Sequence, residues 1–360
     1  MSAGSFSADP VLSDDVWREQ DTEPSAIESA LRELLKRRHA EKASFVPARV
    51  CNLVVVVDRA WRGEVQNRLE RVGRYHPSRT ILCAVEAGRT SLDAWATMSA
   101  EPTEGDICLA HEHVEIEIGP SHLPHLDTIV DPLLVTDLST VVWSPHGHDE
   151  AVDSLVAHAQ VVLLDSVDDP DIERALARST SLADRAYVVD LAWLRSTPWR
   201  ERISASFDPR PLRPLLRSIS GVTIRHHPDS AAAALLLVGW LATRLGWEVG
   251  TATRHGDRWH AKAHARRQDV AIGLEPAPEQ SVRGLAGVTI ETAGGMSLSL
   301  DRGAGGLRAV RRDRAGRLQE WTILGASRGE AGILGEGVRQ ALLRDFTYRP
   351  ALAAASAMAG

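Results

Sequence analysis

The feature that most constrains the fold is a run of residues, VCNLVVVV at positions 50–57, that is apolar almost throughout. A strand with one solvent-exposed face alternates polar and apolar residues. An unbroken apolar run therefore predicts a strand that is covered on both faces. A helical pattern follows at 58–77, and a second buried strand, SRTILCAVE, at 78–86. This order predicts a parallel pair of strands joined by a helical crossover.

The rest of the first half continues in the same way. Apolar strands are expected at 139–145 and 161–166, with a helix at 148–160 between them. Residues 1–24 are acidic and rich in small polar side chains, which predicts a disordered tail. Order is expected to begin at Ser25, which has capping-box spacing to Glu28. We therefore predict an N-terminal domain over 25–170, with a mostly parallel sheet and flanking helices.

The second half predicts a different arrangement. A helix should begin at Asp229 or Ser230 and stop at Gly246, because Asp and Ser cap helix starts and glycine ends helices. Strand patterns at 259–267, 269–275, 287–303 and 317–324 are punctuated by turns, which favours antiparallel pairing. A last helix is expected at 330–346. The C-terminal domain, 171–360, should hold a mixed or antiparallel sheet with helices, so the class is two-domain α/β (α+β).

Composition excludes several classes of function. A net charge of −7 argues against a nucleic-acid binder, since phosphate binding needs a basic surface. The longest apolar run, 231–242, is too short to span a bilayer, and the N-terminus has no secretory pattern. Cys51, Cys83 and Cys108 form no CxxC pair, which fits a reducing cytoplasm and leaves a redox role open.

The stretch CLAHEHVEIEIGPSHLPH, residues 108–125, contains four histidines. On a strand, His111, His113, Glu115 and Glu117 share one face, and mostly apolar residues share the other. This pattern predicts a half-exposed strand. The alternative is a metal-dependent enzyme with His111, His113 and Glu115 as ligands, because imidazoles two residues apart on a strand can hold one ion.

Two further motifs have ordinary explanations. GASRG, residues 325–329, matches the G-x-S-x-G nucleophile motif, but no histidine follows Ser327 to act as the base in the hydrolase order. Five arginines surround a predicted turn at 313–316, which could bind a phosphate or an acidic partner, or could form an exposed hairpin. Glycine-rich phosphate loops are absent from the sequence, and we expect no cofactor.

The segment DLAWLRSTPWRERI, residues 190–203, combines tryptophans with arginines, and the stretch 190–207 is expected to be helical with a break at Pro198. Tryptophan and arginine most often anchor protein interfaces. The same pattern also fits buried tryptophans with arginines around them, and composition does not decide between interface and core. The candidates for partner binding are Trp193, Arg195, Thr197, Pro198, Trp199 and Arg200.

This segment resembles the D-L-x-W-x-R-x-T-P-W-R signature of the glucose-6-phosphate dehydrogenase assembly proteins, the OpcA family of actinobacteria and cyanobacteria. Weaker likenesses to the family occur in the same order at ARVCNLVVVV, RYHPSRTILCAVE, DPLLVTDLSTVVWSPH and DSAAAALLLVGWLATRLGWEV. The resemblance implies a cytoplasmic accessory protein without chemistry of its own. Its implied partner is glucose-6-phosphate dehydrogenase, whose active oligomer it would promote, supporting the oxidative pentose phosphate pathway and NADPH supply.

Two alternatives stay open beside this interpretation. One is the metal-dependent enzyme described above. The other is a sugar-phosphate sensor that uses the arginine-rich second domain.

Overall fold

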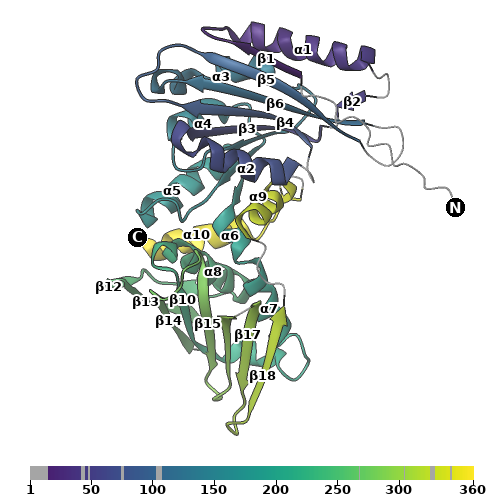
Figure 1. The fold of residues 1–360 in the computed structure, drawn as a ribbon. Coiled ribbons are helices and arrows are strands. Elements are labelled where there is room, and N and C mark those ends of the chain that lie inside the picture. Colours follow the sequence, from purple (N-terminus) through teal and green to yellow (C-terminus); the bar gives the residue numbers. More distant parts are fainter. Residues whose placement is uncertain are drawn as a thin grey trace, which may run out of the picture. The chain divides into compact units, whose positions relative to one another are not determined.

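The structure, a computed structural model, describes residues 15–41, 45–47, 49–73, 77–102, 108–266, 268–303, 305–324, 329–340 and 343–360. The chain divides into two compact units, Met1–Gln160 (unit 1) and Val161–Gly360 (unit 2). Each unit contains strands and helices (Figure 1), which confirms the predicted two-domain α/β (α+β) class. The boundary predicted from the sequence, between residues 170 and 171, falls inside unit 2.

Unit 1 is built on a sheet in which the strands run in the order β1-β5-β6-β4-β3-β7, with β2 beside β6. Strands β6, β4, β3 and β7 pair in parallel, whereas β1–β5 and β5–β6 are antiparallel, so the predicted mostly parallel sheet is confirmed. The strands are β1 (Asp15–Glu19), β2 (Phe45–Pro47), β3 (Cys51–Asp58), β4 (Ser78–Val85), β5 (Asp93–Pro102), β6 (Cys108–Ile118) and β7 (Thr140–Trp143). The helices are α1 (Pro24–Glu41), α2 (Arg62–Gly73), α3 (Leu126–Val130) and α4 (Asp149–Leu155).

Helices cover both faces of this sheet, as Figure 1 shows for α1 and α2 on opposite sides. The central strand β3 is therefore buried from Cys51 to Val57, which is why its sequence is almost continuously apolar. Helix α1 buries Ile27, Leu31 and Leu34 along one stripe, the periodicity expected of an amphipathic surface helix.

The predicted disordered tail is wrong in its last part. Residues 15–19 form strand β1, which pairs with β5 from Asp15–Met98 to Glu19–Ala94. The segment is polar because it forms the edge of the sheet, and an edge strand needs no apolar run. Residues 1–14 lie outside the described part of the chain.

Unit 2 contains a parallel strand pair, a larger sheet and, in its described residues, six α-helices. The strands are β8 (Val161–Leu164), β9 (Tyr187–Asp190), β10 (Ile219–His226), β11 (Glu248–Val249), β12 (Thr253–His255), β13 (Arg258–Ala265), β14 (Gln268–Pro276), β15 (Leu285–Thr292), β16 (Ser297–Gly303), β17 (Gly306–Arg312) and β18 (Leu318–Leu324). The helices are α5 (Ile172–Ala183), α6 (Leu191–Arg195), α7 (Thr197–Phe207), α8 (Ala231–Leu245), α9 (Gly329–Gln340) and α10 (Tyr348–Ala359).

The larger sheet runs in the order β11-β13-β14-β10-β15-β16-β17-β18, with β12 beside β13. Its β10–β14 pair is parallel, whereas β13–β14 and the successive pairs from β10–β15 to β17–β18 are antiparallel, which confirms the predicted mixed sheet. The arginine-bearing segment forms the β17–β18 hairpin. Its turn is set by Asp313, whose carboxylate accepts from the Ala315 amide over 2.9 Å, and by Gly316 at a φ of +79°.

Helix α8 is the core helix of unit 2, buried at every residue from Ala231 to Ala242. Its predicted ends are confirmed, because Ser230 precedes it and Gly246 ends it in the left-handed conformation. Gly239 allows the backbone of α10 to approach closely: a Cβ at this position would lie 2.2 Å from the carbonyl oxygen of Ala351. The predicted apolar run is therefore a packing core for α10.

The break in the signature segment lies slightly earlier than predicted. Helix α6 ends at Arg195 and α7 begins at Thr197, so Pro198 is in the first turn of α7 instead of at the break. Proline is tolerated there because the first turn of a helix has no acceptor for its missing N–H. Helix α10 was not predicted; it follows the last helix expected from the sequence.

Candidate functional site

The order of the parallel strands indicates one edge of the unit 1 sheet as a candidate ligand site. Strand β3 pairs with β4 on one side and β7 on the other, so the chain order reverses at β3. In open α/β sheets, ligands bind beyond the carboxyl ends of the strands at such a switch point. Strand β3 ends at Asp58, and the turn that follows begins with Arg59 and lacks the glycine pattern that brings a backbone close to a pyrophosphate.

Arginine–glutamate ion pairs occupy this edge. The Nε of Arg59 lies 3.3 Å from Oε1 of Glu117, and Arg59 also pairs with Glu86. Arg89 holds Glu86, Asp93 and Glu117 at 2.6–2.7 Å. Because carboxylates already engage both arginines, neither presents an uncompensated charge to a phosphate. Arginines and carboxylates thus form an ion network at this edge, in which the Arg59 side chain is 46% exposed.

The prediction of a half-exposed β6 is wrong. Strand β6 lies between β4 and β5, and side chains from α2 cover the face that carries the odd-numbered residues. The Glu115 side chain is 1% exposed, with its carboxylate 3.0 Å from an Arg62 nitrogen and 2.6 Å from the Gln66 amide nitrogen. The alternation of polar and apolar residues along β6 indicated a solvent-exposed face. In the structure, the polar side chains of that face are paired with residues distant in sequence.

Burial governs the titration of this face. It raises the pKa of Glu115 to about 7, although Arg62 acts in the opposite direction, and it lowers the pKa of His113 to about 4. On the other face of β6, Glu112 is paired with Arg49 and with Arg79, whose Nε lies 2.7 Å away. Strand β6 therefore carries buried, paired carboxylates on both faces, although its even-numbered face is mostly apolar.

The proposed metal ligands do not converge on a common point. Nε2 of His113 lies 4.0 Å from Oε2 of Glu115. The Glu115 carboxylate already contacts Arg62 and Gln66. Within the described residues, no three His, Cys, Asp or Glu side chains are grouped as a metal site would require. His111 is half-buried on the same strand and joins no such group.

The signature segment lies in the core of unit 2. Trp193 and Trp199 are each 2% exposed, and Arg200 is 9% exposed. Arg195 is half-buried, as are Thr197 and Pro198. From the sequence, the tryptophans were equally compatible with a protein interface and with the core. The structure places them in the core.

A stack of two side chains is the centre of this segment. The Arg200 guanidinium carbon lies 3.7 Å from the centroid of the Trp193 ring, a cation–π contact. Arg200 also donates to Oγ1 of Thr197 over 2.9 Å and to Oγ of Ser196 over 3.1 Å. Burial lowers the pKa of Arg200 to about 10, so the side chain remains cationic at neutral pH.

Asp345 joins this stack to the segment before α10. Its Oδ2 accepts a hydrogen bond from Nε1 of Trp193 over 2.8 Å and lies 3.5 Å from a nitrogen of Arg200. The backbone amide of Asp345 donates to Oη of Tyr187 over 2.5 Å. Asp345 and Tyr187 were not predicted as site residues, because nothing local links them to Trp193.

Two buried aspartates complete the arrangement. Asp190 caps α6 by accepting from the Ala192 amide, and its second oxygen accepts from Oη of Tyr348 over 3.2 Å. Asp165 pairs with Arg195 over 2.6 Å, yet burial raises the pKa of Asp165 to about 7. The residues of the signature thus fix β9, α6, α7 and α10 to one another.

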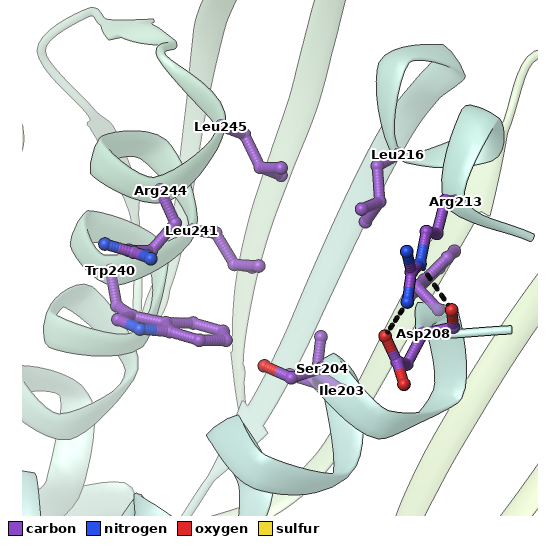
Figure 2. A pocket seen from close by; sticks show the side chains of 10 residues that line it. Ile203, Ser204, Asp208, Arg213, Leu216, Trp240, Leu241, Arg244 and Leu245 are labelled. Carbon is purple, nitrogen blue, oxygen red and sulfur yellow. Dashed lines mark hydrogen bonds and ion pairs between the residues drawn. The ribbon is translucent and has the colours of Figure 1, made fainter. Parts of the chain in front are cut away.

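Unit 2 also contains a pocket of about 330 Å³ between α7, α8 and the short helix η4 (Arg213–Ser218). Figure 2 shows Trp240, Leu241 and Leu245 of α8 pointing toward Ile203 and Ser204 of α7. The polar lining consists of Ser204, Arg244 and the ion pair of Asp208 with Arg213. A sugar phosphate needs several partners for its hydroxyls, so this mainly apolar lining does not favour a sugar-phosphate sensor.

The remaining motifs offer no assembled site within the described residues. Ser327 of the G-x-S-x-G motif lies outside them. In the arginine-bearing hairpin, Arg308 pairs with Glu320 and Arg317 with Asp313. The described part of the chain has no helix long and apolar enough to cross a bilayer.

Family models match the chain in both halves. The model described as glucose-6-phosphate dehydrogenase subunit N-terminal domain matches residues 69–181, and the model for the C-terminal domain of the same subunit matches residues 186–352. Together they span most of the chain, in the order expected for one protein of this family.

Curated relatives agree with the models. An OxPP cycle protein OpcA from Synechococcus elongatus is 27% identical over 52% of this chain and 43% of the relative, and one from Synechocystis sp. is 26% identical over 41% and 32%. The matches thus span less than half of each relative. A solved structure, an oxidoreductase from Sinorhizobium meliloti, aligns over 85% of this chain and 94% of its own at 11% identity, with a TM-score of 0.46. We draw no functional conclusion from a score that low.

Proposed function

This chain belongs to the family of glucose-6-phosphate dehydrogenase assembly proteins, the OpcA family, and from that premise we propose that it is a non-catalytic accessory protein. It binds glucose-6-phosphate dehydrogenase in the cytoplasm and promotes the assembly and activation of that enzyme. The observation that carries the proposal is the match of both subunit models, in order, over most of the chain.

The switch-point edge of unit 1 supports a non-catalytic role. A dehydrogenase of this topology would need that edge to receive its dinucleotide. Here Arg89 and Glu117, whose side chains are 15% and 9% exposed, pair with each other, so opening the edge would leave these two charges without partners. Breaking such pairs is strongly unfavourable, and the edge serves the stability of unit 1 instead.

Activation by an accessory protein has a thermodynamic requirement. The chain shifts the dehydrogenase toward its active, oligomeric state only if it binds that state more tightly than the inactive one. The shift equals the difference between the two binding free energies. We propose that the buried signature residues serve this function indirectly, by holding the binding surface of unit 2 in one conformation.

A co-purification experiment with a paired activity assay tests the proposal. The tagged chain is used to capture the dehydrogenase from lysate of the same organism, and purified dehydrogenase is assayed with and without the chain. We expect capture of the enzyme, together with higher activity or a larger oligomer on size-exclusion chromatography. Absence of capture, with dehydrogenase activity and size unchanged at a tenfold molar excess, would reject the proposed function.

A further inference from the structure

Phe346 is the most exposed large apolar side chain in the described part of the protein, at 83%. Leu343, three residues earlier, is 53% exposed. Single exposed apolar residues are common on soluble proteins. Two in one short segment form an apolar patch, and aromatic rings such as that of phenylalanine are enriched at protein interfaces.

Asp345, immediately before Phe346, is held on three sides. Its Oδ2 accepts from the Trp193 indole, its Oδ1 accepts from the Thr347 amide over 2.8 Å and hydroxyl over 2.6 Å, and its own amide donates to Tyr187. The backbone on both sides of Phe346 is therefore fixed to the core of unit 2, while the ring itself extends into solvent.

A fixed backbone beneath an exposed ring has a consequence for binding. Association normally costs free energy because mobile loops and side chains become ordered, and rigidity before binding removes part of that cost. The signature residues, although buried, thus determine how Phe346 is presented.

The charges around the ring indicate what kind of surface fits it. Arg344 is exposed, with its guanidinium carbon 5.7 Å from the centroid of the Tyr187 ring. Arg349, on the first turn of α10, is exposed, but Asp184 already neutralises its charge at the surface, so Arg344 is the side chain that indicates a partner of opposite charge. A complementary partner surface has an apolar hollow for the ring and carboxylates beside it.

We propose that Phe346 and Leu343 are the apolar anchors by which unit 2 docks into a hollow, bordered by acidic residues, on glucose-6-phosphate dehydrogenase. The inference rests on the proposed function, since it names the surface through which that binding occurs. Trp193, Arg200 and Asp345 act as positioning residues for the anchors.

The test compares two exposed apolar residues in the full-length chain. Dissociation constants for purified dehydrogenase are measured for the wild type, Phe346→Ala and Leu318→Ala; Leu318 is 63% exposed on β18. We expect Phe346→Ala to weaken binding about 30-fold or more, as for an interface hot spot, and Leu318→Ala to change it less than about twofold. Thermal unfolding should be unchanged in both, since neither side chain is buried.

The positioning role has its own readout. If Asp345 acts through Phe346, the effects of Asp345→Asn and Phe346→Ala on the dissociation constant should not add in the double variant. If the wild type binds the dehydrogenase and Phe346→Ala has the same dissociation constant, this inference is wrong but the proposed function still holds. Failure of the wild type to bind the dehydrogenase overturns both.

Discussion

The indole nitrogen of Trp193 donates a hydrogen bond to Oδ2 of Asp345 across 152 residues of sequence, over 2.8 Å. This contact joins an early and a late segment of unit 2, because Trp193 belongs to α6 and Asp345 lies just before the start of α10. The same carboxylate lies near Arg200, which stacks on the Trp193 ring. The tryptophan and arginine of the family signature are therefore explained first by the stability of this contact.

Replacing Trp193 by phenylalanine should destabilise the chain mainly through this hydrogen bond. Asp345 would lose its indole donor, and a partly buried carboxylate that loses a partner costs about 1–3 kcal/mol. Urea unfolding of unit 2, followed by tryptophan fluorescence and circular dichroism, measures the change. Trp199→Phe is the matched control, because Trp199 is equally buried and its indole makes no hydrogen bond that the structure describes. Equal losses at the two positions would contradict the role assigned to the Trp193–Asp345 contact.

The sequence could predict the elements whose burial is uniform. The strand at residues 50–57 is apolar except for Asn52, the core helix is apolar from Ala231 to Ala242, and both were found close to their predicted bounds. An apolar run of this kind indicates burial directly, because only a segment covered on every side is apolar throughout. The two-domain class followed from them.

The site could not be predicted in the same way, because its polar residues are satisfied by distant partners. Alternation on β6 indicated a wet face, yet Glu115 is covered by Arg62 and Gln66 of α2. Asp345 carries no local signal at all, and its importance follows only from its contacts with Tyr187 and Trp193. Periodicity reports which side chains share a face, but not what covers that face.

Glu115→Gln should change how stability depends on pH. The folded-state pKa of about 7 lies above the ordinary 4.5, so between these values the folded chain binds more protons than the unfolded chain. The stability contributed by this group is full below about pH 4.5 and is lost as the pH rises through 7. The variant lacks this titration. Its free energy of unfolding relative to the wild type should therefore rise between pH 5 and pH 8, by at most about 3 kcal/mol at ~1.4 kcal/mol per pKa unit.

Denaturant titrations of both proteins across this pH range provide the measurement. The neighbouring His113, whose pKa is lowered to about 4, contributes an opposite slope between pH 4 and pH 6.5. Comparing the variant with the wild type cancels that slope, because both proteins keep His113. Glu320→Gln on the exposed hairpin is the control and should show no rise. A difference between Glu115→Gln and the wild type that stays constant with pH would contradict the raised pKa.

The buried cysteines should be unreactive in the folded chain. Burial raises the pKa of Cys51 to about 11 and that of Cys83 to about 12, and the thiolate is the form that reacts. With iodoacetamide at pH 8, peptide mass spectrometry should find both residues unmodified before unfolding and modified in 6 M guanidinium chloride. Rapid native labelling of either would show that the strands β3 and β4 open far more readily than their burial implies.

Gly239→Ala tests the close approach of α8 and α10. The added Cβ would lie 2.2 Å from the carbonyl oxygen of Ala351, a backbone atom that moves only if α10 moves. Overpacking of this kind costs about 1–3 kcal/mol, more than the ~1 kcal/mol that alanine gains over glycine in a helix. Gly63→Ala in α2 is the matched control, since a Cβ there meets no atom within 4 Å. Urea midpoints should fall for Gly239→Ala and stay level or rise for Gly63→Ala. If both variants were stabilised alike, α10 would not be packed on α8 at this distance.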